Sequence, residues 1–120
     1  ILPDFSLDTL DSVWYFFGCK DDRFSSWFEA LDYLYDEIMK RDFDIVLLGC
    51  GFFGFPLAAQ IKEVGKQAIH MGGAVQLLFG IKGKRWDNTR IGSCYNEYWI
   101  RPGDETKPKD SNKLDGDCYW

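Results

Sequence analysis

Residues 43–86 read FDIVLLGCGFFGFPLAAQIKEVGKQAIHMGGAVQLLFGIKGKRW, and they decide the fold of this chain of 120 residues. The segment Ile45–Leu48 is a continuous apolar run, which is typical of a parallel strand covered on both faces. A glycine loop follows at positions 49–54. Pro56 and Gly65 then mark the start and the end of a helix. The stretch therefore begins with a strand, a glycine loop and a helix.

A second strand and a second glycine turn complete this unit. The strand is expected at Gln67–His70, and Gly72 and Gly73 follow it. The helix between the two strands has an apolar stripe made of Leu57, Ala58, Ile61 and Val64. We therefore expect a β-loop-α-β unit whose loops bring backbone amides to a helix N-terminus, which is a geometry that binds anions.

The residues before this unit predict another strand and another helix. Residues 13–17 are dense in β-formers and are bounded by Gly18, which predicts a strand. Residues 25–40 predict a helix, because Ser26 and Glu29 have the spacing of a capping box. Its apolar residues also recur with a helical period, at Trp27, Leu31, Leu34 and Ile38.

With a short third helix over residues 74–79, these elements predict an α/β fold in the order β-α-β-α-β-α. We expect residues 1–90 to form a Rossmann-like three-layer sandwich with a short, mainly parallel sheet. Residues 91–120 are rich in Pro, Gly, charged and aromatic residues, and we expect an irregular C-terminal extension of the same domain. Its last residues, Cys118-Tyr119-Trp120, are expected to pin this end to a surface. Ligands of such folds bind at the carboxyl ends of the strands.

Composition and charge narrow the class of protein. The length and a hydrophobic content of 46% suit one compact domain, and the net charge of −5 argues against nucleic-acid binding. No apolar run is long enough to span a bilayer. The four cysteines are widely scattered, as expected of free thiols in a cytoplasmic protein. With one histidine and no closely spaced ligand pairs, no metal site is expected.

The glycine loop carries the first candidate site. Gly49, Gly51 and Gly54 match G-x-G-x-x-G between a strand and a helix, which is the context of a dinucleotide fingerprint. The acidic residue that should end the following strand is replaced by His70, which argues against NAD. The loop is then either a structural turn or a site for another nucleotide or phosphate ligand. Cys50 within it is either reactive or a small residue packed beneath the loop.

The second glycine turn extends this candidate site. His70 stands at a strand end, where it is either a catalytic base or donor to a ligand, or a histidine bonded to nearby backbone. Gly72 and Gly73 present a second set of amides. Gln76 carries an amide able to read a base or a sugar. The alternative for these three residues is a plain helix start with an exposed polar side chain.

A basic segment follows. Lys82, Lys84 and Arg85 form a local surplus of positive charge on an acidic chain, which suggests a diphosphate partner. Trp86 beside them is able to stack on a base. The alternative is an ordinary solvated charged face. These candidates point to a nucleotide or a nucleotide sugar as the ligand.

The whole motif resembles a known group. G-x-G-x-x-G followed by L-A-x-x-I-K-x-x-G-K-x-A-I-H-x-G-G-x-x-Q-L-L-F-G-I-K-G-K-R-W, with NEYWIRP at 96–102 and CYW at 118–120, resembles largely uncharacterised microbial proteins found beside polysaccharide and glycan assembly functions. More distantly it is similar to GT-D-type glycosyltransferases, whose strand end A-I-D-x-G corresponds to residues 68–72. The resemblance implies a nucleotide-sugar transferase fold with residues 49–54 and 70–73 around the donor.

Two departures from the GT-D pattern stand out. The strand-end acid is His70, and the acidic metal-binding motif expected toward the N-terminus does not occur in this sequence. If that motif lies upstream of Ile1, the chain is the C-terminal portion of a larger enzyme.

The first functional hypothesis is that the chain is the nucleotide-sugar-binding portion of a glycosyltransferase. The nucleotide-sugar donor is the one cofactor that we expect under this hypothesis. The glycine loops with Lys82, Lys84 and Arg85 would stabilise the leaving diphosphate. His70 would orient the donor or act as a base. The alternative is a non-catalytic interaction domain that forms a homo-oligomer through its aromatic C-terminal region. A methyltransferase-like domain is a third hypothesis.

Overall fold

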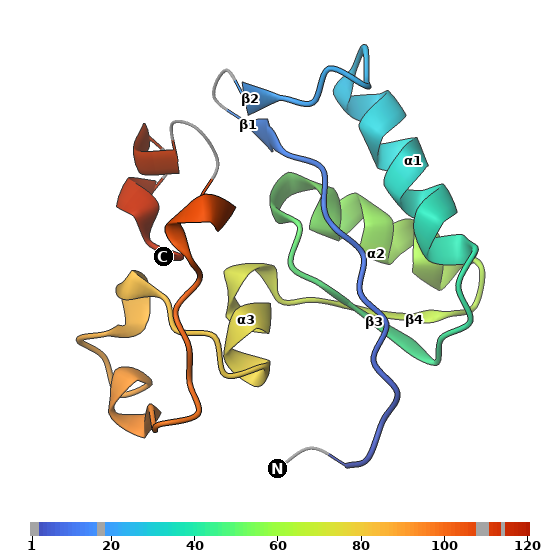
Figure 1. Cartoon of the computed structure of the whole chain (residues 1–120). Helices are drawn as coiled ribbons and strands as arrows, with labels where there is room; N and C mark the ends of the chain where they lie inside the picture. Colours follow the sequence, from blue (N-terminus) through green and yellow to red (C-terminus); the bar gives the residue numbers. More distant parts are fainter. Residues whose placement is uncertain (1–2, 17–18, 108–110, 114) are drawn as a thin grey trace.

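The computed structural model describes residues 3–16, 19–107, 111–113 and 115–120 (Figure 1). These residues form an α/β fold with extents of 39 × 39 × 21 Å. Its strands and α-helices are β1 (Tyr15–Phe16), β2 (Cys19–Lys20), α1 (Trp27–Met39), β3 (Ile45–Leu48), α2 (Gly54–Glu63), β4 (Gln67–His70) and α3 (Val75–Leu78). None of the helices described is both long and apolar enough to cross a membrane.

The predicted β-loop-α-β unit is confirmed. Strands β3 and β4 pair in parallel, with Leu48 opposite His70. Helix α2 connects them and starts at Gly54, so that Pro56 lies in the first turn, where its missing N–H is not needed. Gly65 has a φ of +80° just after the helix, which is the left-handed conformation that ends many helices.

The predicted capping of α1 is also confirmed. Ser26 is the N-cap residue, and its hydroxyl accepts a hydrogen bond from the Glu29 backbone N–H at 3.2 Å. The Glu29 carboxylate accepts in return from the backbone N–H of Ser25 at 2.7 Å, one residue earlier than the expected pairing. Two polar contacts therefore fix the point at which α1 begins.

The core lies between α1, α2 and one face of the parallel sheet. Trp27 of α1 stacks on Phe53 with ring centroids 5.2 Å apart and nearly parallel planes. Leu57 and Ile61 of α2 are fully buried. The core cluster consists of Val13, Phe24, Ala30, Leu31, Leu34, Ile38, Leu48, Phe53, Leu57 and Ile61.

The other face of this sheet is open, which corrects the expectation of a strand covered on both faces. Ile45 and Ile69 point to that face and are 44% and 47% exposed. Within β3, Leu48 is the buried residue, and its side chain points to the covered face. Because no second helical layer covers the open face among the described residues, the expected three-layer sandwich is not confirmed.

We expected the first strand to join the parallel sheet, and this prediction is wrong. Strand β1 pairs with β2 in an antiparallel hairpin, with Tyr15 opposite Lys20, and does not join β3 in the parallel sheet. Residues 17 and 18, which end the predicted strand and follow it, lie outside the described residues. Antiparallel neighbours can be joined by a short connection, whereas a parallel partner requires a long crossover, and this favours pairing of β1 with the adjacent segment. The element order is therefore β-β-α-β-α-β-α.

The residues after α3 form short 3-10 turns linked by backbone contacts. The Lys82 N–H donates to the Ile100 carbonyl at 2.7 Å, which holds two distant parts of this region together. The end of the chain returns to the basic segment, where the Arg85 N–H donates to the Cys118 carbonyl at 2.9 Å. Figure 1 shows this region on the side of α3 away from α1.

Candidate functional site

A cavity of about 620 Å³ lies at the carboxyl ends of β3 and β4. Its volume is within the range of small-molecule sites. The lining comes from residues 12–15, from the loop 49–53, from the segment after β4, and from the C-terminal region. The two glycine loops meet at this edge because the carboxyl ends of parallel strands share one side of a sheet.

Four of the five predicted glycines line the cavity, and Gly54 does not. Gly49, Gly51, Gly72 and Gly73 line it. Gly51 and Gly72 have φ values of +54° and +55°, and no atom lies within 4 Å of the place a Cβ would occupy. Their left-handed backbone favours glycine, and the absence of a side chain leaves the backbone open. Gly49 instead permits close packing, since a Cβ there would overlap Val75.

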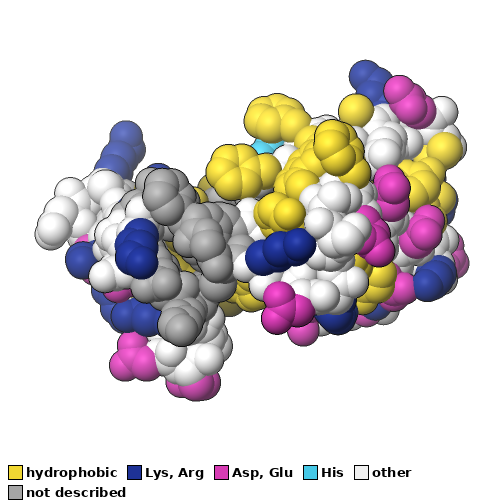
Figure 2. Space-filling view, turned by 90° about the horizontal axis from the view of Figure 1, so that it is seen from above, with side chains coloured by type: hydrophobic (Ala, Val, Ile, Leu, Met, Phe, Trp, Pro, Cys, Tyr) yellow, Lys and Arg dark blue, Asp and Glu magenta, His cyan; other side chains and the backbone are white. Residues whose placement is uncertain are grey.

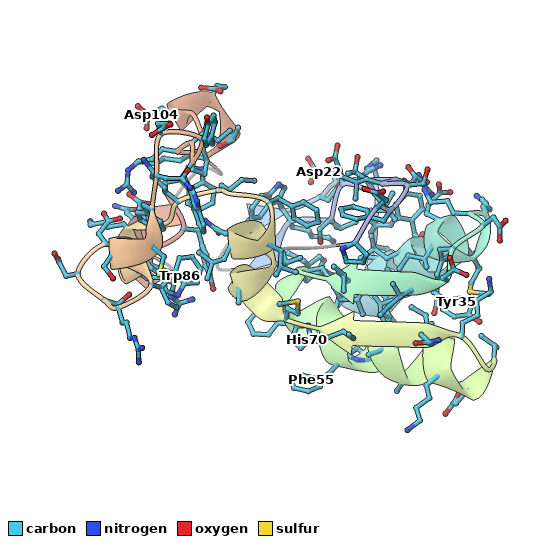
Figure 3. The ribbon with its side chains drawn as sticks, turned by 90° about the horizontal axis from the view of Figure 1, so that it is seen from below. Asp22, Tyr35, Phe55, His70, Trp86 and Asp104 are labelled. Atoms are coloured by element: carbon cyan, nitrogen blue, oxygen red, sulfur yellow. The ribbon has the colours of Figure 1, made fainter. Side chains whose placement is uncertain are left out.

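His70 also lines the cavity, and its ring packs against the start of α2. A Cβ on Gly54 would lie closer than 3.0 Å to three ring atoms of His70, so Gly54 lets the helix approach the end of β4. Figure 2 shows the single histidine among hydrophobic side chains. Phe55 and His70 have ring centroids 4.6 Å apart, and Figure 3 shows the two side by side.

The surroundings of His70 bear on its predicted roles. Its Nδ1 is buried and has no hydrogen-bond partner among the described residues. The alternative in which nearby backbone holds this nitrogen is therefore not observed. A catalytic or ligand-orienting role for His70 stays a prediction.

Gln76 has a structural role that the sequence did not indicate. Its side-chain nitrogen donates to the carbonyl oxygens of Lys82 at 3.1 Å, Tyr119 at 3.3 Å and Ile81 at 3.4 Å. The amide therefore joins α3 to the basic segment and to the end of the chain. Gln76 also lines the cavity, so its contact with a ligand stays a prediction.

The three predicted cations do not line the cavity. The Arg85 guanidinium lies 5.0 Å from the centroid of the Tyr119 ring, and its Nη1 donates to the Tyr119 hydroxyl at 2.9 Å. The Lys82 ammonium lies 5.7 Å from the Tyr95 ring. Lys84 is exposed. The structure thus brings the glycine loops and His70 together at the cavity, whereas the three cations lie outside its lining and Arg85 contacts its aromatic wall.

That wall consists of residues that were not predicted as site residues. Trp14 and Trp120 line the cavity with ring centroids 6.4 Å apart. The Trp120 Nε1–H donates to the Thr106 hydroxyl at 2.8 Å. Tyr119 packs so closely on Gly73 that a Cβ there would overlap its ring. The one sequence signal for these site residues was the density of aromatic residues at both ends of the sequence. The expected contact of residues 118–120 with the rest of the chain is observed.

The polar side chains of the cavity lining are few and come mainly from Ser12, Gln76 and Thr106, with the His70 ring beside them. The lining contains no Asp, Glu, Lys or Arg side chain among the described residues. Burial raises the pKa of the Cys50 thiol, so the thiol stays protonated near neutral pH and is a poor nucleophile. Among all the residues that the structure describes, no group of three or more His, Cys, Asp or Glu side chains is placed to hold a metal ion.

Comparison with known proteins adds no relative. No protein-family model matches the sequence, and neither a curated protein nor a solved structure matches it. The function is therefore argued from the cavity and its lining.

Proposed function

We propose that this chain binds a nucleotide sugar in the cavity and is the nucleotide-sugar-binding portion of a glycosyltransferase with a Rossmann-like core. The observation that carries the proposal is that Gly51 and Gly72 expose left-handed backbone to the same cavity from two different loops. Sites for phosphorylated ligands in α/β folds lie at this edge of the sheet.

The diphosphate is proposed to lie at the glycine loops. The turn Gly51–Phe53 continues into α2, where the N–H groups of Phe53 and Gly54 already donate to the carbonyl oxygens of Cys50 and Gly51. The amides proposed to face the diphosphate are therefore those of Gly51 and Phe52, which line the cavity just before α2. These amides and the helix dipole favour an anion. His70 at the end of β4 would then orient the donor or act as a base.

The cations take a different part in this proposal than the sequence suggested. Because Lys84 and Arg85 do not line the cavity, we propose that they attract the diphosphate over a distance rather than bind it directly. Such attraction is screened over about 8 Å at physiological ionic strength. Lys84→Ala should therefore weaken nucleotide binding at low salt and have little effect at high salt.

The test compares two glycines that both have a left-handed φ, +54° at Gly51 and +80° at Gly65. Gly51 lies in the cavity wall, and Gly65 lies after α2, outside the cavity lining; both have positive φ and open space at the Cβ position. Gly51→Ala and Gly65→Ala should therefore cost similar folding stability. Only Gly51→Ala should abolish binding of UDP, GDP or their sugar conjugates.

Binding is measured by thermal shift and confirmed by calorimetry, with NAD and adenosylmethionine as comparison ligands. A ligand at a hundred times its dissociation constant adds about 2.7 kcal/mol of stability. Equal binding to the Gly51→Ala and Gly65→Ala variants would count against the proposal, as would a response to NAD or adenosylmethionine alone. Among the described residues, no Asp or Glu follows β4 at the cavity in the place where dinucleotide and adenosylmethionine sites carry one, which ranks a methyltransferase lower.

One observation favours the alternative of a non-catalytic interaction domain. Phe55, which packs on His70, is 76% exposed, and Phe52 of the glycine loop is 67% exposed. Hydrophobic side chains gather around the histidine on this surface (Figure 2). Exposed apolar patches mark interaction sites in many proteins. Light scattering across a range of concentrations tests this alternative: self-association that Phe55→Ser abolishes, without any nucleotide response, would support it.

A further inference from the structure

We infer that the aromatic end of the cavity is a stacking subsite for a nucleobase, formed by Trp14 and Trp120. The inference rests on the proposed function, because it assigns the neutral part of the nucleotide to one wall of the same cavity. Both indole rings line the cavity, and they come from opposite ends of the chain. Trp14 is 48% exposed, so its ring offers a face to a ligand.

The Trp120 ring is held in place before any ligand arrives. Its Nε1–H is bonded to Thr106, and its backbone carbonyl accepts from the Lys84 N–H at 3.2 Å. The neighbouring Tyr119 is fixed by Gln76 and Arg85. A ring held in this way does not lose side-chain entropy on binding, which favours affinity.

The chemistry of the wall selects a neutral, planar ligand. Among the described residues no Asp, Glu, Lys or Arg side chain lines the cavity, and the Trp120 Nε1–H is already bonded to Thr106, so this end offers a ligand mainly aromatic surface. Every base has a π-face that stacks on aromatic side chains, and such stacking is worth about tenfold to a hundredfold in affinity. The polar atoms of the ligand are left to the glycine loops and to His70.

The experiment uses nucleosides, because they carry the base without a phosphate. Uridine, guanosine and ribose 5-phosphate are titrated into the full chain, and the indole N–H signals are followed by NMR. Nucleosides should shift the Trp14 and Trp120 signals, whereas ribose 5-phosphate should not. Trp14→Leu should weaken nucleoside binding by about tenfold to a hundredfold.

Trp99→Leu is the matched control, since Trp99 packs on Tyr95 and does not line the cavity. Equal nucleoside affinity in the Trp14→Leu and Trp99→Leu variants would overturn the inference. Unchanged Trp14 and Trp120 signals in the unmutated chain would overturn it as well, which keeps the test decisive if Trp14→Leu does not fold.

The two proposals fail in different ways. UDP binding that is lost in Gly51→Ala but unchanged in Trp14→Leu would overturn the stacking subsite alone. Nucleoside binding that gains nothing from an added diphosphate would support the subsite and count against the proposed function. If neither nucleosides nor nucleotides bind, both are wrong.

Discussion

Replacing Gly54 by alanine should change the free energy of unfolding through two effects of opposite sign. Gly54 is the first residue of α2 and has helical backbone angles, with φ −61° and ψ −43°. In an unobstructed helix, alanine in place of glycine adds about 1 kcal/mol of stability. Here the new Cβ would lie closer than 3.0 Å to three atoms of the His70 ring. The substitution therefore asks whether helix propensity or close packing decides the outcome.

The packing effect should be the larger one. Non-bonded carbon atoms prefer about 3.5–4.0 Å, so the start of α2 and the end of β4 have to separate. Overpacking of this kind costs about 1–3 kcal/mol. We expect the upper part of that range, because His70 belongs to β4 and its ring already packs on Phe55. After the gain in propensity, Gly54→Ala should lower the free energy of unfolding by about 2 kcal/mol.

Urea denaturation of four proteins provides the assay: the unmutated chain, Gly54→Ala, His70→Ala and the double variant. Removing the imidazole makes room for the methyl group, so alanine at position 54 should be harmless or stabilising in the His70→Ala background. The coupling energy between the two positions should exceed about 1 kcal/mol. If Gly54→Ala stabilises the chain with His70 present, or if the coupling is near zero, the reasoning is refuted.

Three further predictions follow from other contacts. Hydrogen bonds from Ser25 hold the pKa of Glu29 below its usual range, so its contribution to stability is present above pH ~4.3 and is lost as the pH falls further. Glu29→Gln should flatten the decline of the unfolding free energy in acid, measured by urea denaturation between about pH 3 and 6. Cys94 is exposed whereas burial raises the pKa of Cys50, so a thiol reagent at neutral pH should label Cys94 first; equal rates in variants that keep one of the two would contradict this. Gln76→Leu removes three hydrogen bonds to the surrounding backbone and should speed proteolytic cleavage near the end of the chain, an effect that mass spectrometry detects.

The parts of the fold that depend on local signals were predictable. The cap at Ser26 and the positions of Pro56 and Gly65 follow from backbone preferences within a few residues, and these helices form where expected. The partner of β1 was not predictable, because a run of β-formers does not say which strand it joins or in which direction. The apolar run Ile45–Leu48 was misleading for a similar reason, since its residues are hydrophobic on both faces although one face of the sheet is open.

The candidate site also has parts that were predictable from the sequence and parts that were not. Gly51 and Gly72 could be placed together because the carboxyl ends of neighbouring parallel strands meet. Trp14 and Trp120 could not, because contacts between the two ends of a sequence leave no periodic pattern. The charge surplus around Arg85 indicated a ligand contact, whereas the structure uses its guanidinium to hold Tyr119.

Trp14 and Trp120, which both line the cavity, also determine when the cavity is completed during synthesis of the chain. The unit from β3 to β4 lies within residues 45–70 and has its pairing partners as soon as it leaves the ribosome. The cavity lacks a wall until Trp120 has emerged, several seconds later at about 5–20 residues per second. A small molecule that fills this cavity therefore cannot guide the early steps of folding on the ribosome. A ligand in this cavity stabilises the chain only once both tryptophans are in place.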